Sequence, residues 1–127
     1  MLINVESHRS VEEVRSRLEE KAKERGFGVL SVHEVSWILQ EKGHPIDYPC
    51  VIVEICQPSS ASRVLSQNPY IATALPCRIA VFRKDGRTLL STIAPTTMLE
   101  MFEEPELEDT AREVEQTIRE IMEESAR

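Results

Sequence analysis

The chain has few glycines, few aromatic residues and no long apolar run, and each shortage excludes a class of protein. Only four of its 127 residues are glycine, and they do not cluster into a phosphate-binding loop. Aromatic residues make up 5% of the chain, too few for the stacking platforms that bind nucleic acid. The apolar runs are strand-sized, whereas a membrane-spanning helix needs about 20 apolar residues. We therefore expect no nucleic acid and no membrane among its partners.

Catalytic, metal-binding and export signals are also missing. The chain contains neither H-E-x-x-H nor G-x-S-x-G, and His8, His33 and His44 lack the spacing of zinc ligands. Residues 1–10 lack the basic patch and apolar stretch of a secretory signal. The three cysteines form an odd set without C-x-x-C spacing, which is typical of reduced thiols in a cytosol. We expect a cytoplasmic protein with no metal site and lean against an enzyme; the sequence defines no cofactor.

The chain does have an ordinary globular composition and an acidic C-terminal end. A length of 127 residues, with 41% apolar and 29% charged, suits one domain with its own core. The net charge is −7, but residues 100–127 hold eleven Asp and Glu against three Arg, a local charge of −8 that leaves the remainder at +1. An acidic end of this kind repels phosphate groups, which again disfavours nucleic acid and anionic membranes.

Helical and strand patterns alternate along the sequence. Ser10 and Glu13 form a capping box, and apolar residues recur at helical spacing from Val11 until Gly26, which favours a helix stop. Glycine and proline signals bound further short helices at 35–42, 59–66 and 95–101. Runs rich in β-branched residues predict strands at 2–5, 27–32, 50–56, 77–82 and 87–93.

The last two strands form the clearest local pairing. Asp85-Gly86 lies between them, and this dipeptide is a strong hairpin signal because both residues must adopt positive φ. We therefore predict an antiparallel hairpin over residues 77–93, within a single small sheet of about 4–5 mixed strands packed against helices. The expected fold class is α+β, with residues 1–127 as a single domain.

A long acidic helix is expected at 107–125. Its apolar residues follow one another at spacings of four and three, which gives a narrow apolar seam; they are Leu107, Ala111, Val114, Ile118 and Ile121. Two heptads are too few for a free coiled coil, so something must cover the seam. We favour docking onto the domain's own sheet; packing against the same helix of a second subunit is the alternative.

The strand at 50–56 carries candidate functional residues because its two faces differ. Every second residue is Val or Ile and predicts a buried face, whereas the other face includes a carboxylate, Glu54, and the thiol of Cys56. Cys56 comes just before Pro58, where a helix is expected to begin, and the positive end of a helix dipole lowers the pKa of a thiol. A neighbouring carboxylate would raise that pKa and oppose the effect. We take Cys56 as a candidate reactive thiolate, with Glu54 beside it.

Cys77 is the third candidate, at the start of the next strand. If strands 50–56 and 77–82 run parallel, Cys56 and Cys77 lie at opposite ends of the sheet, about 20 Å apart. If the strands run antiparallel, both cysteines lie at one end, and a disulfide becomes possible once their Cα atoms approach within about 7 Å. The sequence leaves both arrangements open.

Several spaced motifs give the chain a resemblance to a known family. Glu54-Ile55-Cys56-Gln57-Pro58 is followed by Leu75-Pro76-Cys77 and then Asp85-Gly86, and this series resembles the domain of unknown function 302 family of small prokaryotic proteins. The resemblance implies an α+β fold and a homodimer, marks the two cysteines in these motifs as matching the family's own, and implies no activity or cofactor. Gln57 stands where the family has Asn, and because Gln is a weaker helix cap we expect less local order at this turn.

Three functions from different classes remain open. The first is a small dimeric ligand-binding or protein-interaction module with a cleft near Cys56, whose partners are a small molecule and a second copy of the chain. The alternative is a thiol-based redox or metal-handling protein that uses Cys56 with Cys77. The third is an acyl-transfer or hydrolytic enzyme with Cys56 as nucleophile, although the sequence positions no histidine as its base.

Overall fold

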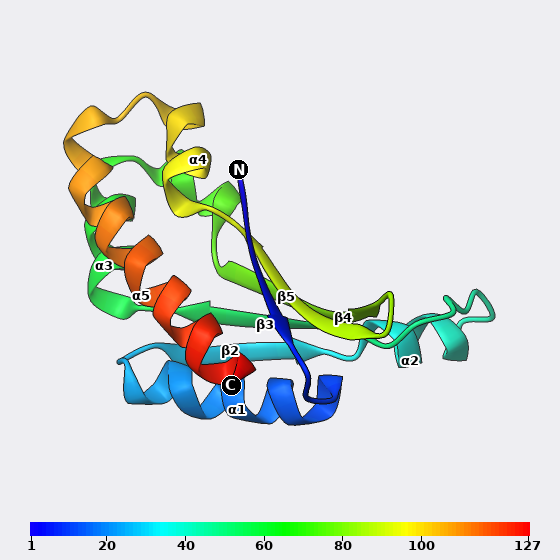
Figure 1. Ribbon diagram of the computed structural model, residues 1–127. Helices are drawn as coiled ribbons and strands as arrows, with labels where there is room; N and C mark the ends of the chain where they lie inside the picture. The colour runs from blue at the N-terminus through cyan, green and yellow to red at the C-terminus, as the bar shows by residue number, and fades with distance from the viewer.

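One five-stranded sheet organises the molecule (Figure 1). The computed structural model describes all 127 residues, and its strands are β1 (Leu2–Ser7), β2 (Gly28–His33), β3 (Cys50–Cys56), β4 (Cys77–Lys84) and β5 (Arg87–Ile93). The strand order is β1-β5-β4-β3-β2, and all four pairings are antiparallel. The predicted α+β fold is confirmed; the sheet differs from the expected mixed sheet only in having no parallel pair.

Helices fill the connections between strands. They are α1 (Val11–Glu24), α2 (Val35–Glu41), α3 (Pro58–Gln67), α4 (Pro95–Leu99) and α5 (Glu108–Ala126), with 3-10 turns at Pro69–Ala74, Glu100–Phe102 and Pro105–Leu107. The chain passes through α1 from β1 at one edge of the sheet to β2 at the other, and the meander from β2 to β5 returns it to β1. None of these helices is long and apolar enough to cross a membrane.

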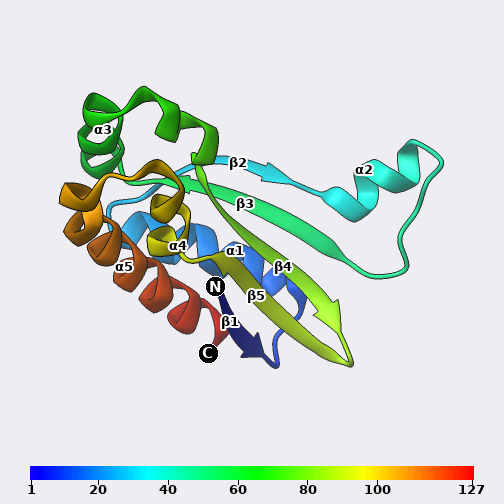
Figure 2. The same cartoon turned by 90° about the horizontal axis from the view of Figure 1, so that it is seen from above.

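The main core lies between the sheet and two packed helices, α1 and α5 (Figures 1 and 2). The predicted stripe of α1 is buried, and Leu18 at its centre is fully covered. The acidic helix α5 docks onto its own sheet, as we favoured, because Ile118 and Ile121 belong to the same core as the strands. Its buried side is wider than the predicted seam, since Thr110 and Met122 are buried as well.

Local signals produce the expected local structure. The Ser10 hydroxyl accepts a hydrogen bond from the Glu13 N–H at 3.1 Å and so caps α1. Asp85 and Gly86 have φ values of 52° and 77°, the positive values that a two-residue hairpin requires. The predicted hairpin is therefore confirmed.

The two faces of the sheet differ in cover. Along β3, Val51, Val53 and Ile55 are buried against helices, while the residues between them are only partly buried. In Figure 2 the middle of β3, β4 and β5 lies in front of α1, with no helix in front of it. We call the helix-covered side the inner face and the other side the outer face.

Candidate functional site

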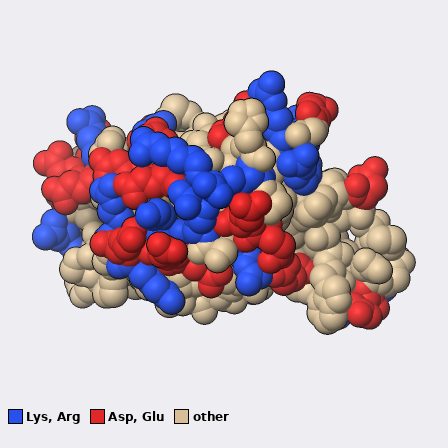
Figure 3. All heavy atoms as spheres, turned by 60° about the horizontal axis from the view of Figure 1, so that its bottom comes forward, with Lys and Arg blue, Asp and Glu red and all other residues tan.

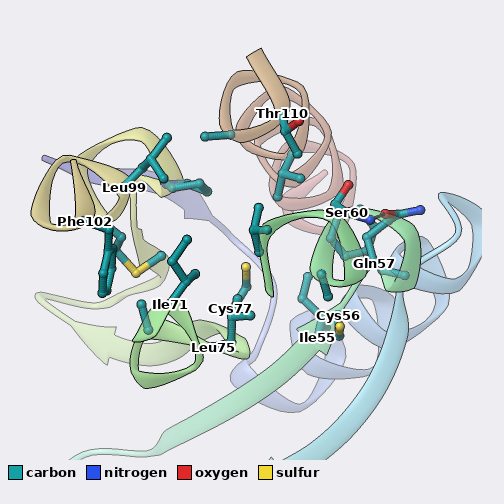
Figure 4. A pocket seen from close by; sticks show the side chains of 18 residues that line it. Ile55, Cys56, Gln57, Ser60, Ile71, Leu75, Cys77, Leu99, Phe102 and Thr110 are labelled. Carbon is teal, nitrogen blue, oxygen red and sulfur yellow. Dashed lines mark hydrogen bonds between the residues drawn. The ribbon is translucent and has the colours of Figure 1, made fainter. Parts of the chain in front are cut away.

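An apolar cavity opens at one end of the sheet, where β3 ends and β4 begins (Figure 4). Its walls come from α3, the 3-10 turn at Pro69–Ala74, α4 with the turn that follows it, and the start of α5. Eighteen residues line it, 14 of them apolar, and its volume is about 80 Å³. The apolar wall includes Ile71, Leu75, Leu99 and Phe102.

The cavity exists because short connecting helices, which lie beyond the core packing of α1, meet at this end. The chain leaves β3 through α3, returns to β4 through Pro69–Ala74, and leaves β5 through α4. No residue of α3 is buried, yet Ala61 and Val64 face the cavity from that helix. An apolar helix side normally packs against a core. Here part of it lines the cavity instead.

One corner of the cavity is polar. Gln57 and Ser60 at the start of α3 and Thr110 near the start of α5 supply the only lining side chains with amide or hydroxyl groups. Arg63 does not line the cavity, but its guanidinium donates a hydrogen bond to the Thr110 hydroxyl oxygen at 3.1 Å. The lining therefore combines an apolar wall with a small set of hydrogen-bonding groups and contains no Asp, Glu, Lys, Arg or His.

Gln57 caps α3 although Gln is ordinarily a weak helix cap. Its side-chain oxygen accepts hydrogen bonds from the Ser60 N–H at 2.6 Å and from the Ser59 hydroxyl at 2.8 Å. Pro58 occupies the first turn, where its fixed φ suits a helix start and its missing N–H costs nothing. The longer glutamine side chain reaches the same amide that an asparagine would satisfy.

Cys77 is the thiol inside the cavity. It is buried, with 9% of its surface exposed, and Figure 4 shows its sulfur directed into the space. Burial raises the pKa of the Cys77 thiol to about 11; negative charge at Cys56 adds to the rise and Arg78 opposes it. The Cys77 thiol is therefore protonated and uncharged at neutral pH.

The antiparallel arrangement brings Cys56 to the same end of the sheet as Cys77, but on the other face. The residue that pairs with Cys77 across β3 and β4 is Ile55, so Cys56 is offset by one position. Successive side chains of a strand point to opposite faces, and a disulfide needs Cβ atoms that point toward each other. Both thiols are free. This geometry disfavours a Cys56–Cys77 disulfide, although Cys56 still borders the cavity.

Glu54 shares the outer face with Cys56 but has other partners. Its carboxylate forms a hydrogen bond with the His33 ring at 2.7 Å and an ion pair with the Arg78 guanidinium at 3.2 Å. The hydrogen bond from His33 is the largest cause that lowers the pKa of Glu54; burial opposes it, and the charges of His33 and Arg78 reinforce it. The carboxylate is thus held by an ion cluster rather than placed to act on the thiol.

The sequence offered no single signal for this cluster or for a base beside Cys56. Arg78 pairs directly with Glu54 across β3 and β4, which could be seen only once the strand register was known. On β2, Gly28 pairs with Cys56, whereas His33 pairs with Ile52 at the other end of the strand. No group of three or more His, Cys, Asp or Glu side chains lies close enough together to hold a metal ion.

These features define a small α+β domain with an apolar cavity at one end of an open antiparallel sheet. A family model described as Domain of unknown function DUF302 matches residues 3–125. The chain therefore belongs to the DUF302 family, and the resemblance seen in the sequence is confirmed.

A solved structure agrees with this assignment. The crystal structure of an uncharacterized conserved protein DUF302 from Bacillus stearothermophilus is similar to this chain with a TM-score of 0.93 and 34% sequence identity. The alignment covers 99% of this chain and 98% of that one. No curated protein matches the chain.

Proposed function

We propose that this protein is a small ligand-binding module whose cavity holds an aliphatic molecule. The observation that carries the proposal is the composition of the lining: 14 of 18 residues are apolar, and none is Asp, Glu, Lys, Arg or His. Ligand sites are typically apolar pockets with a few well-placed polar groups. An unpaired charge against the apolar wall would be strongly disfavoured, so the part of the ligand that contacts this wall is uncharged.

The size of the cavity favours a chain over a ring. Its volume of about 80 Å³ is smaller than the roughly 150 Å³ of a closed apolar cavity that accommodates benzene. A thin aliphatic chain can enter such a space, and part of it can extend through the open side. Each buried methylene contributes about 0.8 kcal/mol to binding, which is about fourfold in affinity.

A chain-length series of primary alcohols from 1-butanol to 1-octanol tests the proposal. We expect affinity to increase about fourfold per methylene until the cavity is filled, with the largest backbone amide NMR shifts at the residues lining the cavity. Ala61→Phe should fill the cavity and abolish binding. Ala72→Phe, on an exposed alanine outside the cavity, is the matched control. Equal binding by both variants would refute the proposal.

We propose further that the module is a homodimer, with a second copy on the outer face. Leu2 and Ile93 pair at the edge of this face and are 58% and 50% exposed, and Phe82 and Leu89 lie nearer its centre. Monomeric proteins rarely leave an apolar surface of this kind uncovered. The projecting α2 adds Trp37, which is 61% exposed.

Charge supports a second copy as the occupant. The whole chain has a net charge of −7. Figure 3, which brings the bottom of Figure 1 forward, shows many acidic and basic side chains on that side of the molecule. On the outer face, by contrast, Glu6 pairs with Arg87 at 2.6 Å and Glu54 pairs with Arg78. Because these charges are already balanced, two copies can approach through this face with little repulsion.

Sedimentation velocity at micromolar concentration tests the dimer. The wild-type protein should sediment as a dimer, and Phe82→Glu should give a folded monomer because a carboxylate would then be buried between the subunits. Tyr70→Glu changes a residue that is 75% exposed and lies in the 3-10 turn at Pro69–Ala74, outside the strands, and it should leave the dimer intact. A wild-type monomer would disprove this part of the proposal.

A further inference from the structure

We infer that the ligand ends in a hydrogen-bond-accepting oxygen, the carbonyl or carboxyl oxygen of an aliphatic compound, and that Ser60 and Thr110 bind this oxygen. The inference rests on the proposed function and adds to it the chemical class and the orientation of the ligand. It depends on what the polar corner can still donate once its bonds within the protein are counted.

Thr110 is the central donor. Its side chain is buried, and its hydroxyl oxygen already accepts a hydrogen bond from Arg63 at 3.1 Å. The hydroxyl hydrogen has no acceptor among the hydrogen bonds of the protein. A buried hydroxyl with a free hydrogen is unfavourable unless it finds an acceptor. Because Thr110 lines the cavity, a ligand oxygen can supply that acceptor.

Ser60 and Gln57 complete the corner. The Ser60 hydroxyl takes part in no hydrogen bond within the protein, although its backbone N–H is bonded to Gln57. The Gln57 side-chain oxygen is occupied twice, and Figure 4 shows its amide nitrogen directed away from the cavity, so Gln57 holds the start of α3 in place and does not donate to the ligand. Figure 4 shows these three side chains on one side of the cavity, opposite Leu99 and Phe102 on the apolar wall. A ligand lying across the cavity would have its oxygen at one end and its chain at the other.

The groups that contact the polar corner directly favour an acceptor, although Glu108 and Asp109 precede Thr110 in the first turn of α5. Ser60 and Thr110 are each the third residue of their helices, where the backbone N–H groups give a partial positive charge. Arg63 adds a full positive charge one hydrogen bond from the cavity, and it belongs to none of the ion pairs in the protein. Glu106 is bonded to Gln67 at the far end of α3. An ammonium head group would therefore meet donors and a neighbouring cation.

Three eight-carbon probes with different head groups test the inference: 2-octanone, octanoate and octylammonium. Backbone amide NMR titrations should show that octylammonium binds at least tenfold more weakly than the better of the other two. Tighter binding of 2-octanone would identify a neutral carbonyl, and tighter binding of octanoate a carboxylate. In the carboxylate case, Arg63→Met should weaken octanoate more than 2-octanone.

A matched pair of variants on α5 isolates the hydroxyl. Thr110→Val keeps the shape of the side chain and should weaken the better probe about three- to tenfold, the effect of one lost hydrogen bond. Thr117→Val removes a hydroxyl that bonds only within α5 and should change nothing. Xenon cannot accept a hydrogen bond, so it reports only on the apolar cavity. It should bind both variants equally if the cavity is intact.

The outcomes separate the inference from the proposed function. The head-group inference is wrong if octylammonium binds as tightly as the best of the other probes, or if Thr110→Val has as little effect on binding as Thr117→Val. Binding of xenon and the probes would still support the apolar site. If neither xenon nor any probe binds, the proposed function fails, and the inference fails with it.

Discussion

The inner and outer faces of the same sheet are made from alternate residues of the same strands, yet they are built differently. On β3 and β4 most inner residues are aliphatic and buried, and Val53 and Ile79 are fully covered. The outer residues of the same strands include the ion pair of Glu54 with Arg78 and partly exposed apolar side chains. The inner face thus holds the core, whereas the outer face is only partly covered.

The cavity lies at the end of the sheet, beyond the region where α1 packs. Its thiol, Cys77, belongs to the inner face, while Cys56 at the same end belongs to the outer one. Two cysteines that are close in the sheet therefore have different environments. The difference between the two faces therefore includes the candidate site. It can be tested by comparing the same type of residue on each face.

The largest effect should come from truncating the same side chain on the two faces. Ile79→Ala removes a fully buried side chain and should lower the free energy of unfolding by about 2–5 kcal/mol. Ile52→Ala, on the outer face, should cost about 1 kcal/mol because the side chain is only partly covered. Chemical denaturation measures both values. Equal losses would mean that the outer face is packed as tightly as the inner one.

The two cysteines should differ strongly in reactivity. With its pKa raised to about 11 from an ordinary 9.0, Cys77 has roughly a hundredfold less thiolate near neutral pH than the same thiol in an unfolded chain. In a variant with Cys50→Ser and Cys56→Ser, folded Cys77 should be alkylated at least a hundredfold more slowly than after unfolding. The rate should increase about tenfold per pH unit up to about pH 11.

A variant that retains only Cys56 provides the comparison for this measurement. Its thiol is on the outer face and partly exposed, so it should react before Cys77 does. If Cys77 reacted as fast as Cys56 at neutral pH, the cavity thiol would be neither buried nor protonated as described.

The smallest effect concerns the ion cluster on the outer face. The pKa of Glu54 is lowered, so the folded state favours the charged carboxylate; this contribution is present above the ordinary carboxyl pKa of 4.5 and is lost as the pH falls below it. The melting temperature of wild type should therefore exceed that of Glu54→Gln near neutral pH, and the difference should shrink in acid. A difference that stayed constant down to pH 2 would show that the carboxylate charge is irrelevant.

The sequence predicted those parts of the fold that depend on neighbouring residues. The capping box at Ser10, the alternation along strand 50–56 and the Asp85-Gly86 turn are local patterns, and each produced the expected element. The register of β3 against β4 is not local. Without it, the pairing of Glu54 with Arg78 and the opposite orientation of the two cysteines could not be predicted.

From the sequence, only the approximate position of the cavity could be predicted, not the residues that line it. The motif around Cys56 lies at the end of the sheet where the cavity opens, because a strand there passes into a helix. Ser60 and Thr110 were missed because they come from segments about 50 residues apart that meet only in the folded chain. Neither residue stands out in the sequence, since a serine or threonine in the first turn of a helix is ordinary.

The most direct test of the account is a backbone amide NMR titration of the wild-type protein and Ala61→Phe with 1-octanol. In the wild type, saturable shifts should concentrate at cavity residues such as Ile71, Leu75 and Thr110, and in Ala61→Phe they should vanish while the spectrum remains that of a folded protein. Shifts spread over the outer face, or shifts that persist unchanged in Ala61→Phe, would contradict a binding site in the cavity.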